Sequence, residues 1–206
     1  MDRALQRMRV MVLEGTLSPG EQIRQQEMAE LLGVSRVPLR EALNVMAEQG
    51  LLTHRPHSGY FVSKRSPDEV RQIRRMLELI ENEVMATIAW PSAALVKQLR
   101  ALNQQMRDAA SAHDWIRLMH LNRDFHFQIF GLSPEHLILD ELRRLWGLAE
   151  PLFAQKLAHP AAAEKTVLEH DALIDAIEAQ DRAASLNALN VHRNSSVPES
   201  VQRTAG

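Results

Sequence analysis

Residues 31–50 have the sequence LLGVSRVPLREALNVMAEQG, which predicts the end of one helix, a tight turn and a second helix. Gly33 suits the left-handed backbone conformation that often ends a helix. Ser35 is a favourable N-terminal cap for the next helix, and Pro38 is tolerated in its first turn, where a missing N–H costs little. The apolar residues at helical spacing on its predicted buried face are Leu39, Ala42, Leu43 and Met46. Two helices joined by a glycine-containing turn are typical of a helix-turn-helix.

The flanking sequence predicts a winged form of this motif. Helical spacing predicts a helix over residues 3–14, which a turn rich in glycine and proline ends. A short helix is expected over residues 25–32. Residues 51–62 predict two short strands around a turn at residues 55–59. The order helix, helix, turn, helix and hairpin therefore predicts a winged helix-turn-helix domain over residues 1–65.

The second helix of such a motif enters the major groove of DNA with its N-terminal residues facing the base edges. Arg36, Arg40 and Asn44 are spaced i, i+4 and i+8, so they share one face of this helix. Arginine is the usual bidentate partner of guanine, and asparagine that of adenine. The predicted DNA-binding residues are Ser35, Arg36, Val37, Pro38, Arg40 and Asn44 on the helix, with His57 and Gly59 at the hairpin tip. The alternative is that the arginines only solvate a helix face, but the combined placement of the turn glycine, capping serine, arginine pair and wing glycine favours DNA binding.

The sequence after residue 66 has a helical pattern almost to the C-terminus. The predicted helices span residues 67–89, 92–110, 114–130, 135–157, 161–179 and 182–194. The fold class is therefore mainly α, with the winged helix-turn-helix followed by an all-α helical bundle over residues 66–195. Residues 196–206 have little apolar content, and we expect them to form a flexible tail.

The composition excludes several classes of protein. The 206 residues contain no cysteine, which excludes disulfide frameworks, thiolate zinc sites and cysteine nucleophiles. No apolar run reaches the roughly 18 residues of a transmembrane helix, and the N-terminus lacks the apolar core of a signal peptide. We therefore expect a soluble cytoplasmic protein with no membrane partner. Residues 1–65 carry 9 basic and 7 acidic side chains, whereas residues 66–206 carry 15 and 19, which suits a DNA-binding domain beside an acidic regulatory domain.

Three histidines in the C-terminal half follow the predicted helical pattern. Asn122 and His126 are spaced i, i+4 on one predicted helix. His170 lies within an apolar stripe of another helix, and His192 lies beside Leu189 on the last helix. Three imidazoles and a carbonyl oxygen brought from three helices into a bundle core can hold a divalent metal, and imidazole suits zinc or nickel. The alternative is that these histidines are ordinary core residues.

The N-terminal part of the chain resembles the GntR family of bacterial regulators. The residues that carry the resemblance are 15–23 (GTLSPGEQI), 31–43 (LLGVSRVPLREAL), 50–52 (GLL) and 59–62 (GYFV). The resemblance implies that Arg36 and Arg40 contact operator bases, and that wing residues near His57 and Gly59 reach the minor groove or the backbone. A third arginine often present in the family is replaced here by Gln26, which implies a weaker, uncharged contact.

The C-terminal part resembles the FCD ligand-binding domain of the FadR-type subgroup, in its smaller, VanR-like form with six helices. The segments that carry this resemblance are 122–126 (NRDFH), 169–177 (EHDALIDAI) and 181–192. The resemblance implies a metal held by three histidines, here His126, His170 and His192, and by one acidic residue, whose place Asn122 takes as a neutral, weaker ligand.

The resemblance also implies a small carboxylate effector beside the metal and a cation on the first C-terminal helix that helps to bind it. Arg74 is the candidate for this cation, because it flanks the apolar stripe of the predicted helix, whereas Arg75 points almost the opposite way. A structural ion pair between Arg74 and a helix acid is the alternative.

These features together predict a homodimeric, ligand-responsive repressor that binds operator DNA and a small organic acid. A two-fold dimer matches a pseudo-palindromic operator. Two alternatives remain open from the sequence. One is a sensor for which the metal alone is the signal. The other is a metal-dependent enzyme, which is disfavoured because no general base or nucleophile lies beside the predicted ligands.

Overall fold

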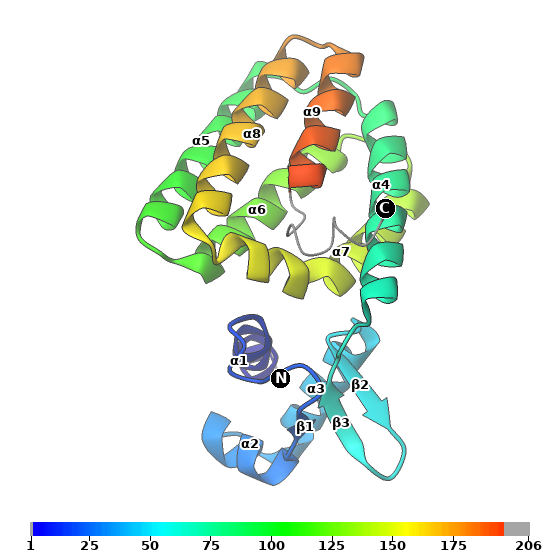
Figure 1. Cartoon of the computed structure of the whole chain (residues 1–206), viewed down its shortest axis with the longest axis vertical. Helices are drawn as coiled ribbons and strands as arrows, with labels where there is room; N and C mark the ends of the chain where they lie inside the picture. Colours follow the sequence, from blue (N-terminus) through cyan, green and yellow to red (C-terminus); the bar gives the residue numbers. More distant parts are fainter. Residues whose placement is uncertain (1, 196–206) are drawn as a thin grey trace.

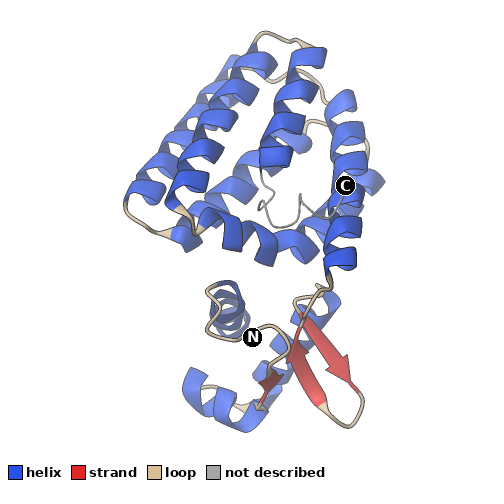
Figure 2. Cartoon of the chain, viewed as in Figure 1, coloured by secondary structure: helices blue, strands red, loops and turns tan. Residues whose placement is uncertain are grey.

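The computed structural model describes residues 2–195, which form a small domain and a larger helical domain along the long axis of the molecule (Figure 1). Strands occur only in the small domain, and the regular structure of the larger domain is helical (Figure 2). This architecture confirms the predicted fold class. The tail predicted over residues 196–206 lies outside the described residues. None of the helices within residues 2–195 has the length and apolar character needed to cross a lipid bilayer.

The small domain combines helices with an antiparallel sheet. Its elements are α1 (Asp2–Leu13), β1 (Gln22–Ile23), α2 (Gln25–Leu32), α3 (Arg36–Glu48), β2 (Leu52–Arg55) and β3 (Gly59–Val62). The sheet has the strand order β1-β3-β2, so the hairpin β2–β3 gains a short third strand on its β3 side. The sequence did not predict β1, because a two-residue strand is too short to show the alternation that identifies a strand.

The packing of α3 explains why this segment folds as predicted. Its apolar face is buried, and Leu39, Leu43 and Met46 each have 0% of their surface exposed. Gly33 ends α2 with a φ of 65°, and its N–H bonds to carbonyl oxygens of the last turn, as expected of a glycine C-cap. Ser35 lies at the N-cap position of α3, but its side chain accepts no capping hydrogen bond. Burial of the apolar face, more than the cap, therefore stabilises α3.

The large domain contains the six predicted helices, and their ends differ from the prediction by at most two residues. They are α4 (Pro67–Thr87), α5 (Ala93–Ser111), α6 (Trp115–Phe130), α7 (His136–Leu157), α8 (Pro160–Glu178) and α9 (Arg182–Ser195). Ser66 and Glu69 form a capping box that starts α4 directly after the small domain. α6 and α8 both pack against α5, and α7 lies across the end of the bundle that faces the small domain (Figure 1).

The two domains meet where α1 and the end of α3 approach α7. Arg9 on α1 donates from Nε to Oε2 of Glu150 on α7 at 3.0 Å, and from Nη2 to Oε1 of Gln49 at 3.1 Å. Glu150 is 6% exposed, so this ion pair lies largely out of water. Arg9 thus connects α7 to the C-terminal end of the predicted recognition helix.

A second contact at this junction involves the residue that follows α3. Gly50 has a φ of 73°, and a Cβ placed on it would lie 2.2 Å from Cδ2 of Leu148 on α7. Arg65, in the connection between β3 and α4, donates from Nη2 to the carbonyl oxygen of Gly50 at 3.0 Å. The absence of a side chain at residue 50 therefore allows the close approach of α3 and α7.

We expect Gly50→Ala to lower the free energy of unfolding by about 1 kcal/mol more than Gly33→Ala does. Alanine strains the backbone at both positions because both have positive φ, but only at residue 50 does the new methyl group collide with Leu148. Urea unfolding of both variants, in the wild-type and Leu148→Ala backgrounds, measures the difference. The additional cost should vanish with Leu148→Ala, and an additional cost that persists there would argue against the contact between the domains.

Candidate functional site

The residues predicted to bind DNA lie on the exposed side of α3 and on the hairpin. The exposed members of this set are Ser35, Arg36, Val37, Arg40, Asn44 and His57, whereas Pro38 and Gly59 are half-buried. Hairpin β2–β3 lies beside α3 and extends away from the large domain (Figure 1). His57 at its tip has a φ of 62° and Gly59 a φ of 88°, so the turn between the strands is tight. One surface of the small domain thus presents both the helix and the wing.

Gln26 on α2 contributes to this surface through Arg36. The Nη2 of Arg36 donates a hydrogen bond to Oε1 of Gln26 at 3.0 Å. An uncharged acceptor at residue 26 can hold the guanidinium in place, whereas an arginine there would repel it. Gln26 therefore orients Arg36 toward the outer face of the motif.

Asn44 is engaged by the wing in a way that the sequence did not predict. The hydroxyl of Tyr60 on β3 donates a hydrogen bond to Oδ1 of Asn44. Tyr60 is 4% exposed and its ring lies 4.6 Å from that of His54. A bidentate contact to adenine needs both the oxygen and the nitrogen of the amide. In this structure the oxygen of Asn44 accepts a hydrogen bond within the protein, so it does not take part in such a bidentate contact.

The three predicted histidines converge in the core of the large domain. They come from α6 (His126), α8 (His170) and α9 (His192), and their exposed fractions are 2%, 0% and 7%. Nε2 of His126 lies 3.1 Å from Nε2 of His192 and 3.2 Å from Nε2 of His170. Nitrogens that bind one zinc ion at about 2.0–2.1 Å lie roughly 3.3 Å apart in tetrahedral geometry. The ligand nitrogens of all three imidazoles, called the histidine cluster below, lie within 4.8 Å of one another, and two of the three spacings are close to the tetrahedral value, which is compatible with a shared divalent ion.

A carboxylate outside the cluster fixes one of the imidazoles. Nδ1 of His192 lies 3.2 Å from Oε2 of Glu169, and the same oxygen accepts a hydrogen bond from Ser195 Oγ at 2.6 Å. A carboxylate beside Nδ1 favours the tautomer with the proton on that nitrogen, so that the lone pair of Nε2 faces the cluster. His170 is held differently, by a stacked contact with the ring of Phe125 at 4.1 Å.

Asn122 supplies an oxygen to the same region. It is 6% exposed, it lies one helical turn before His126, and it lines the same cavity as His126 and His192. Among the described residues, Oδ1 of Asn122 has no hydrogen-bond partner. A buried acceptor without a partner is costly, and a metal ion is one group that satisfies it. Three imidazole nitrogens and this oxygen are a donor set that fits zinc or nickel.

The cluster is electrically neutral at neutral pH. Burial lowers the pKa of His126 and His170 well below the usual 6.5, and the neighbouring imidazoles and cations lower it further. Burial also lowers the pKa of His192, although Glu169 opposes the change. Metal ligation requires neutral imidazole, so the protein holds these side chains in the protonation state that a metal site needs.

A cavity of about 270 Å³ opens beside the histidine cluster. Its polar lining residues include Arg65, Arg74, Glu81, Asn122, His126, Lys156, Thr166, His192 and Arg193, and its apolar lining includes Leu77, Trp146, Ala149, Phe153 and Leu157. Burial lowers the pKa of Lys156 to about 8. The cavity thus combines the histidine cluster with several cations and apolar walls.

Arg74 lies where the sequence analysis expected it, on the wall of this cavity. It is half-buried, and burial lowers its pKa. Within residues 2–195 no carboxylate lies within ion-pair distance of Arg74, which disfavours the alternative of a structural ion pair. Arg75 is exposed and pairs with Glu78 at 2.7 Å, in agreement with its predicted orientation toward solvent.

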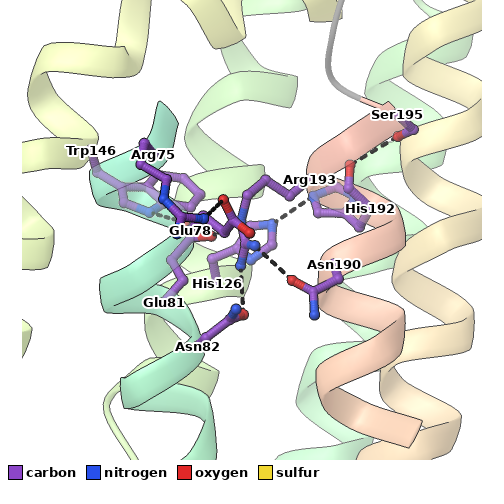
Figure 3. Close-up of polar contacts among 10 residues, drawn as sticks. All are labelled: Arg75, Glu78, Glu81, Asn82, His126, Trp146, Asn190, His192, Arg193 and Ser195. Carbon is purple, nitrogen blue, oxygen red and sulfur yellow. Dashed lines mark hydrogen bonds and ion pairs between the residues drawn. The ribbon is translucent and has the colours of Figure 1, made fainter. Parts of the chain in front are cut away.

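A polar network that the sequence did not predict lies on the cavity wall (Figure 3). Glu81 on α4 is 4% exposed and accepts hydrogen bonds at 2.8 Å from Trp146 Nε1 and from Arg193 Nε. Arg193 also donates to Asn82 and Asn190. Burial raises the pKa of Glu81, and the nearby positive charge of Arg193 opposes this rise. The sequence contained a signal for this network, because Glu81 falls in phase with the apolar residues of α4, and an acid on a buried face needs a partner.

Comparison with known families agrees with both halves of this description. Residues 69–195 match the FCD domain, and residues 1–62 match the bacterial regulatory proteins of the gntR family. The chain belongs to the GntR family. The predicted membership, with its FCD domain, is therefore confirmed. Members of this family are regulators rather than enzymes, which confirms the prediction that the chain is not an enzyme.

Individual relatives support the same assignment. The chain is 26% identical over 180 residues to the HTH-type transcriptional regulator McbR of Escherichia coli (strain K12). The matched region covers 85% of this chain and 80% of the relative. It is 26% identical over 190 residues to the HTH-type transcriptional repressor RspR of the same strain, which spans 91% of this chain and 82% of the relative. The solved structure of E. coli McbR/YncC has the same fold, with a TM-score of 0.80 at 19% identity over 98% of this chain and 97% of that one. This GntR protein is thus a transcriptional regulator with a DNA-binding domain and an effector-binding FCD domain.

Metal-free protein should lose stability as the pH falls below about 6.5, because the pKa values of the three histidines are lowered in the folded state and stay near the ordinary value in the unfolded chain. The unfolded state then binds more protons, so the stability present at neutral pH is lost on acidification. Thermal unfolding of protein stripped with EDTA, followed from neutral to mildly acidic pH, measures this loss. His170→Phe removes one of the titrating groups and should reduce the change in unfolding temperature with pH. An equal change in unfolding temperature in this variant would contradict the explanation.

Proposed function

We propose that this GntR regulator is a homodimeric cytoplasmic repressor that binds operator DNA through α3 and the wing. In the proposal, a small carboxylate effector binds beside a divalent ion, zinc or nickel, in the FCD domain. The strongest support is the convergence of the three imidazoles beside a cavity whose wall includes His126, His192, Arg74 and the orphaned oxygen of Asn122.

The DNA-binding part of the proposal rests on the exposed face of the small domain. Arg36 and Arg40 lie on the first two turns of α3, where major-groove contacts to base edges are made. Ser35, Val37 and Pro38 lie beside them in the chain, and His57 and Gly59 at the hairpin tip would contact the DNA backbone. Asn44 contributes through its Nδ2 donor, since Tyr60 occupies its oxygen.

The metal-binding part assigns four residues as ligands. His126, His170 and His192 would donate Nε2, and Asn122 would donate Oδ1. A divalent ion held there supplies a positive centre that attracts an anionic oxygen. Glu169 keeps His192 in the tautomer that the site needs, and Phe125 fixes the ring of His170 by stacking.

The effector part follows from the chemistry of the cavity wall. Arg74 offers a guanidinium without a carboxylate partner among the described residues, and guanidinium groups bind carboxylates with two parallel hydrogen bonds. Thr166 Oγ1 is a further buried oxygen that lacks a hydrogen-bond partner within the described chain. An anionic ligand would satisfy these groups. The cavity also favours an organic effector over a sensor of metal alone, because about 270 Å³ exceeds the volume of a single ion.

Transmission to DNA would use α7, which contributes to both sites. Trp146, Phe153 and Lys156 of this helix line the cavity, whereas Leu148 and Glu150 contact the small domain. A ligand that binds one arrangement of α7 better than another shifts the population of that arrangement. Because Glu150 is connected through Arg9 to the end of α3, the position of α3 would change with it.

The dimer in the proposal places two such domains on the half-sites of a pseudo-palindromic operator. Met76 and Leu79 on α4 support an association through the large domain, because they expose 38% and 55% of their surface to solvent on one face of that helix. Exposed apolar side chains grouped on a helix favour contact with a partner surface.

Specific DNA binding should depend on Arg36 and Arg40. We expect Arg36→Ala and Arg40→Ala each to weaken binding to the operator by on the order of 1–3 kcal/mol, with a smaller effect on non-specific DNA, because each loses a base contact. Fluorescence anisotropy on an operator selected from random DNA measures both affinities. The control is Lys97→Ala on α5, which removes one positive charge far from α3. Wild-type operator affinity in both folded arginine variants would refute the assignment of α3 as the recognition helix.

Zinc or nickel should bind the FCD domain with one ion per chain and should raise the thermal unfolding temperature. At a free metal concentration one hundred times Kd, the stabilisation should be about 2.7 kcal/mol. His126→Ala should abolish both effects, whereas His120→Ala, which changes an exposed histidine of the same helix, should preserve them. Calorimetric titration of EDTA-treated protein provides the measurement. Equal metal binding by the His126 and His120 variants would show that the ion lies elsewhere.

A further inference from the structure

The donor set of the histidine cluster carries no negative charge. Its members are three neutral imidazoles and the carboxamide of Asn122. Among the histidine, aspartate and glutamate side chains within residues 2–195, only the three histidines converge, and no carboxylate joins them. Glu169 contacts the cluster through Oε2, which lies beside His192 Nδ1 and accepts a hydrogen bond from Ser195 Oγ, while its buried Oε1 has no hydrogen-bond partner among the described residues. Glu169 therefore acts on the cluster through His192 and does not take the place of the acid that is missing at residue 122.

The surroundings of the cluster add positive charge to this neutral set. Arg74 and Lys156 line the same cavity, and Glu169 offsets part of the charge of Lys156. Arg193 also lines it, but Glu81 pairs with that side chain at 2.8 Å and offsets its charge. A divalent ion here would keep its full charge in a region where the three imidazoles are at most 7% exposed. Uncompensated charge of this kind is costly in a weakly polar interior.

We propose that Asn122 makes metal binding conditional on the effector, so that the divalent ion and an anionic ligand bind this protein together and each binds weakly alone. The carboxylate of the effector then supplies the negative charge that the protein ligands lack. This inference rests on the proposed metal and effector site. It adds that the protein responds only when the divalent ion and the anionic effector are both present. A chain with aspartate at residue 122 would hold its ion without the effector.

The coupling between ion binding and effector binding is reciprocal, and the cavity also offers a contact for a second carboxylate group of the effector. If an anion raises the affinity for the ion, the ion raises the affinity for the anion by the same factor. Arg74, which has no carboxylate partner among the described residues, gives a second carboxylate a place to bind in the same cavity. A short dicarboxylate therefore fits these groups better than a monocarboxylate, because it can reach the ion and a cation at once.

Cobalt(II) titration of the EDTA-treated, full-length protein tests this inference, with visible absorption and calorimetry as readouts. The probes are succinate, its neutral analogue succinamide and acetate, in a buffer without other carboxylates or phosphate. In the wild type, succinate should tighten cobalt binding by about tenfold to one hundredfold. Acetate should tighten it less, and succinamide should leave it unchanged.

Two substitutions at residue 122 distinguish the effect of adding a negative charge from the effect of losing the asparagine side chain. Asn122→Asp should bind cobalt tightly without any anion, and its gain from succinate should fall below about threefold, because the aspartate already supplies the charge. Asn122→Ala should bind cobalt more weakly and should keep its dependence on succinate. If Asn122→Asp does not fold, the dependence of the wild type and of Asn122→Ala on the charge of the probe still decides the question.

Failure of the inference is distinguishable from failure of the site. If the wild type binds cobalt equally well with and without succinate, and His126→Ala abolishes that binding, the metal site stands and the conditional binding is wrong. If neither the wild type nor Asn122→Asp binds cobalt in the presence of succinate, the metal site itself is wrong, and the inference falls with it.

Discussion

The structure depends above all on three imidazole nitrogens that are held 3.1 and 3.2 Å apart in an apolar core. The helices α6, α8 and α9 must pack at the positions that produce this convergence. Each neutral imidazole has one N–H, so a ring nitrogen at this distance can accept a hydrogen bond from its neighbour, and the lowered pKa values of the histidines disfavour additional protons. If a divalent ion binds these nitrogens, as proposed, the free energy of the fold is linked to that binding.

The helix α7 gives this core a connection to DNA. Its cavity side carries Trp146 and Phe153, and its other side carries Leu148 and Glu150 against the small domain. A single 22-residue helix transmits displacement well, because its backbone hydrogen bonds resist internal change. Pro151, which follows Glu150, cannot donate a backbone hydrogen bond within α7, and proline inside a helix is a common cause of bending.

Charge distribution ties the two sites to different physical demands. The α3 face presents exposed cations for the proposed DNA contacts, and the neutral Gln26 accepts a hydrogen bond from Arg36 there. The FCD cavity offers the proposed effector Arg74, a cation partly out of water, where an anion would gain more from each contact. Glu81 shows the energetic cost of burying a charged group in this cavity. Burial disfavours its ionised carboxylate, and the hydrogen bonds from Arg193 and Trp146 compensate for that cost.

The sequence by itself determined the helix-turn-helix, the six helices of the FCD domain, the shared face of Asn122 and His126 and the inward phase of His170, because local propensity and a period of 3.6 residues encode them directly. It also separated Arg74 from Arg75 by phase alone. Only the tertiary structure decided that Tyr60 occupies the oxygen of Asn44, that Glu81 pairs with Arg193, and that α7 contacts the end of α3. These contacts join residues that are far apart in the chain or lie on different elements. Their partners are selected by packing, which no local pattern encodes.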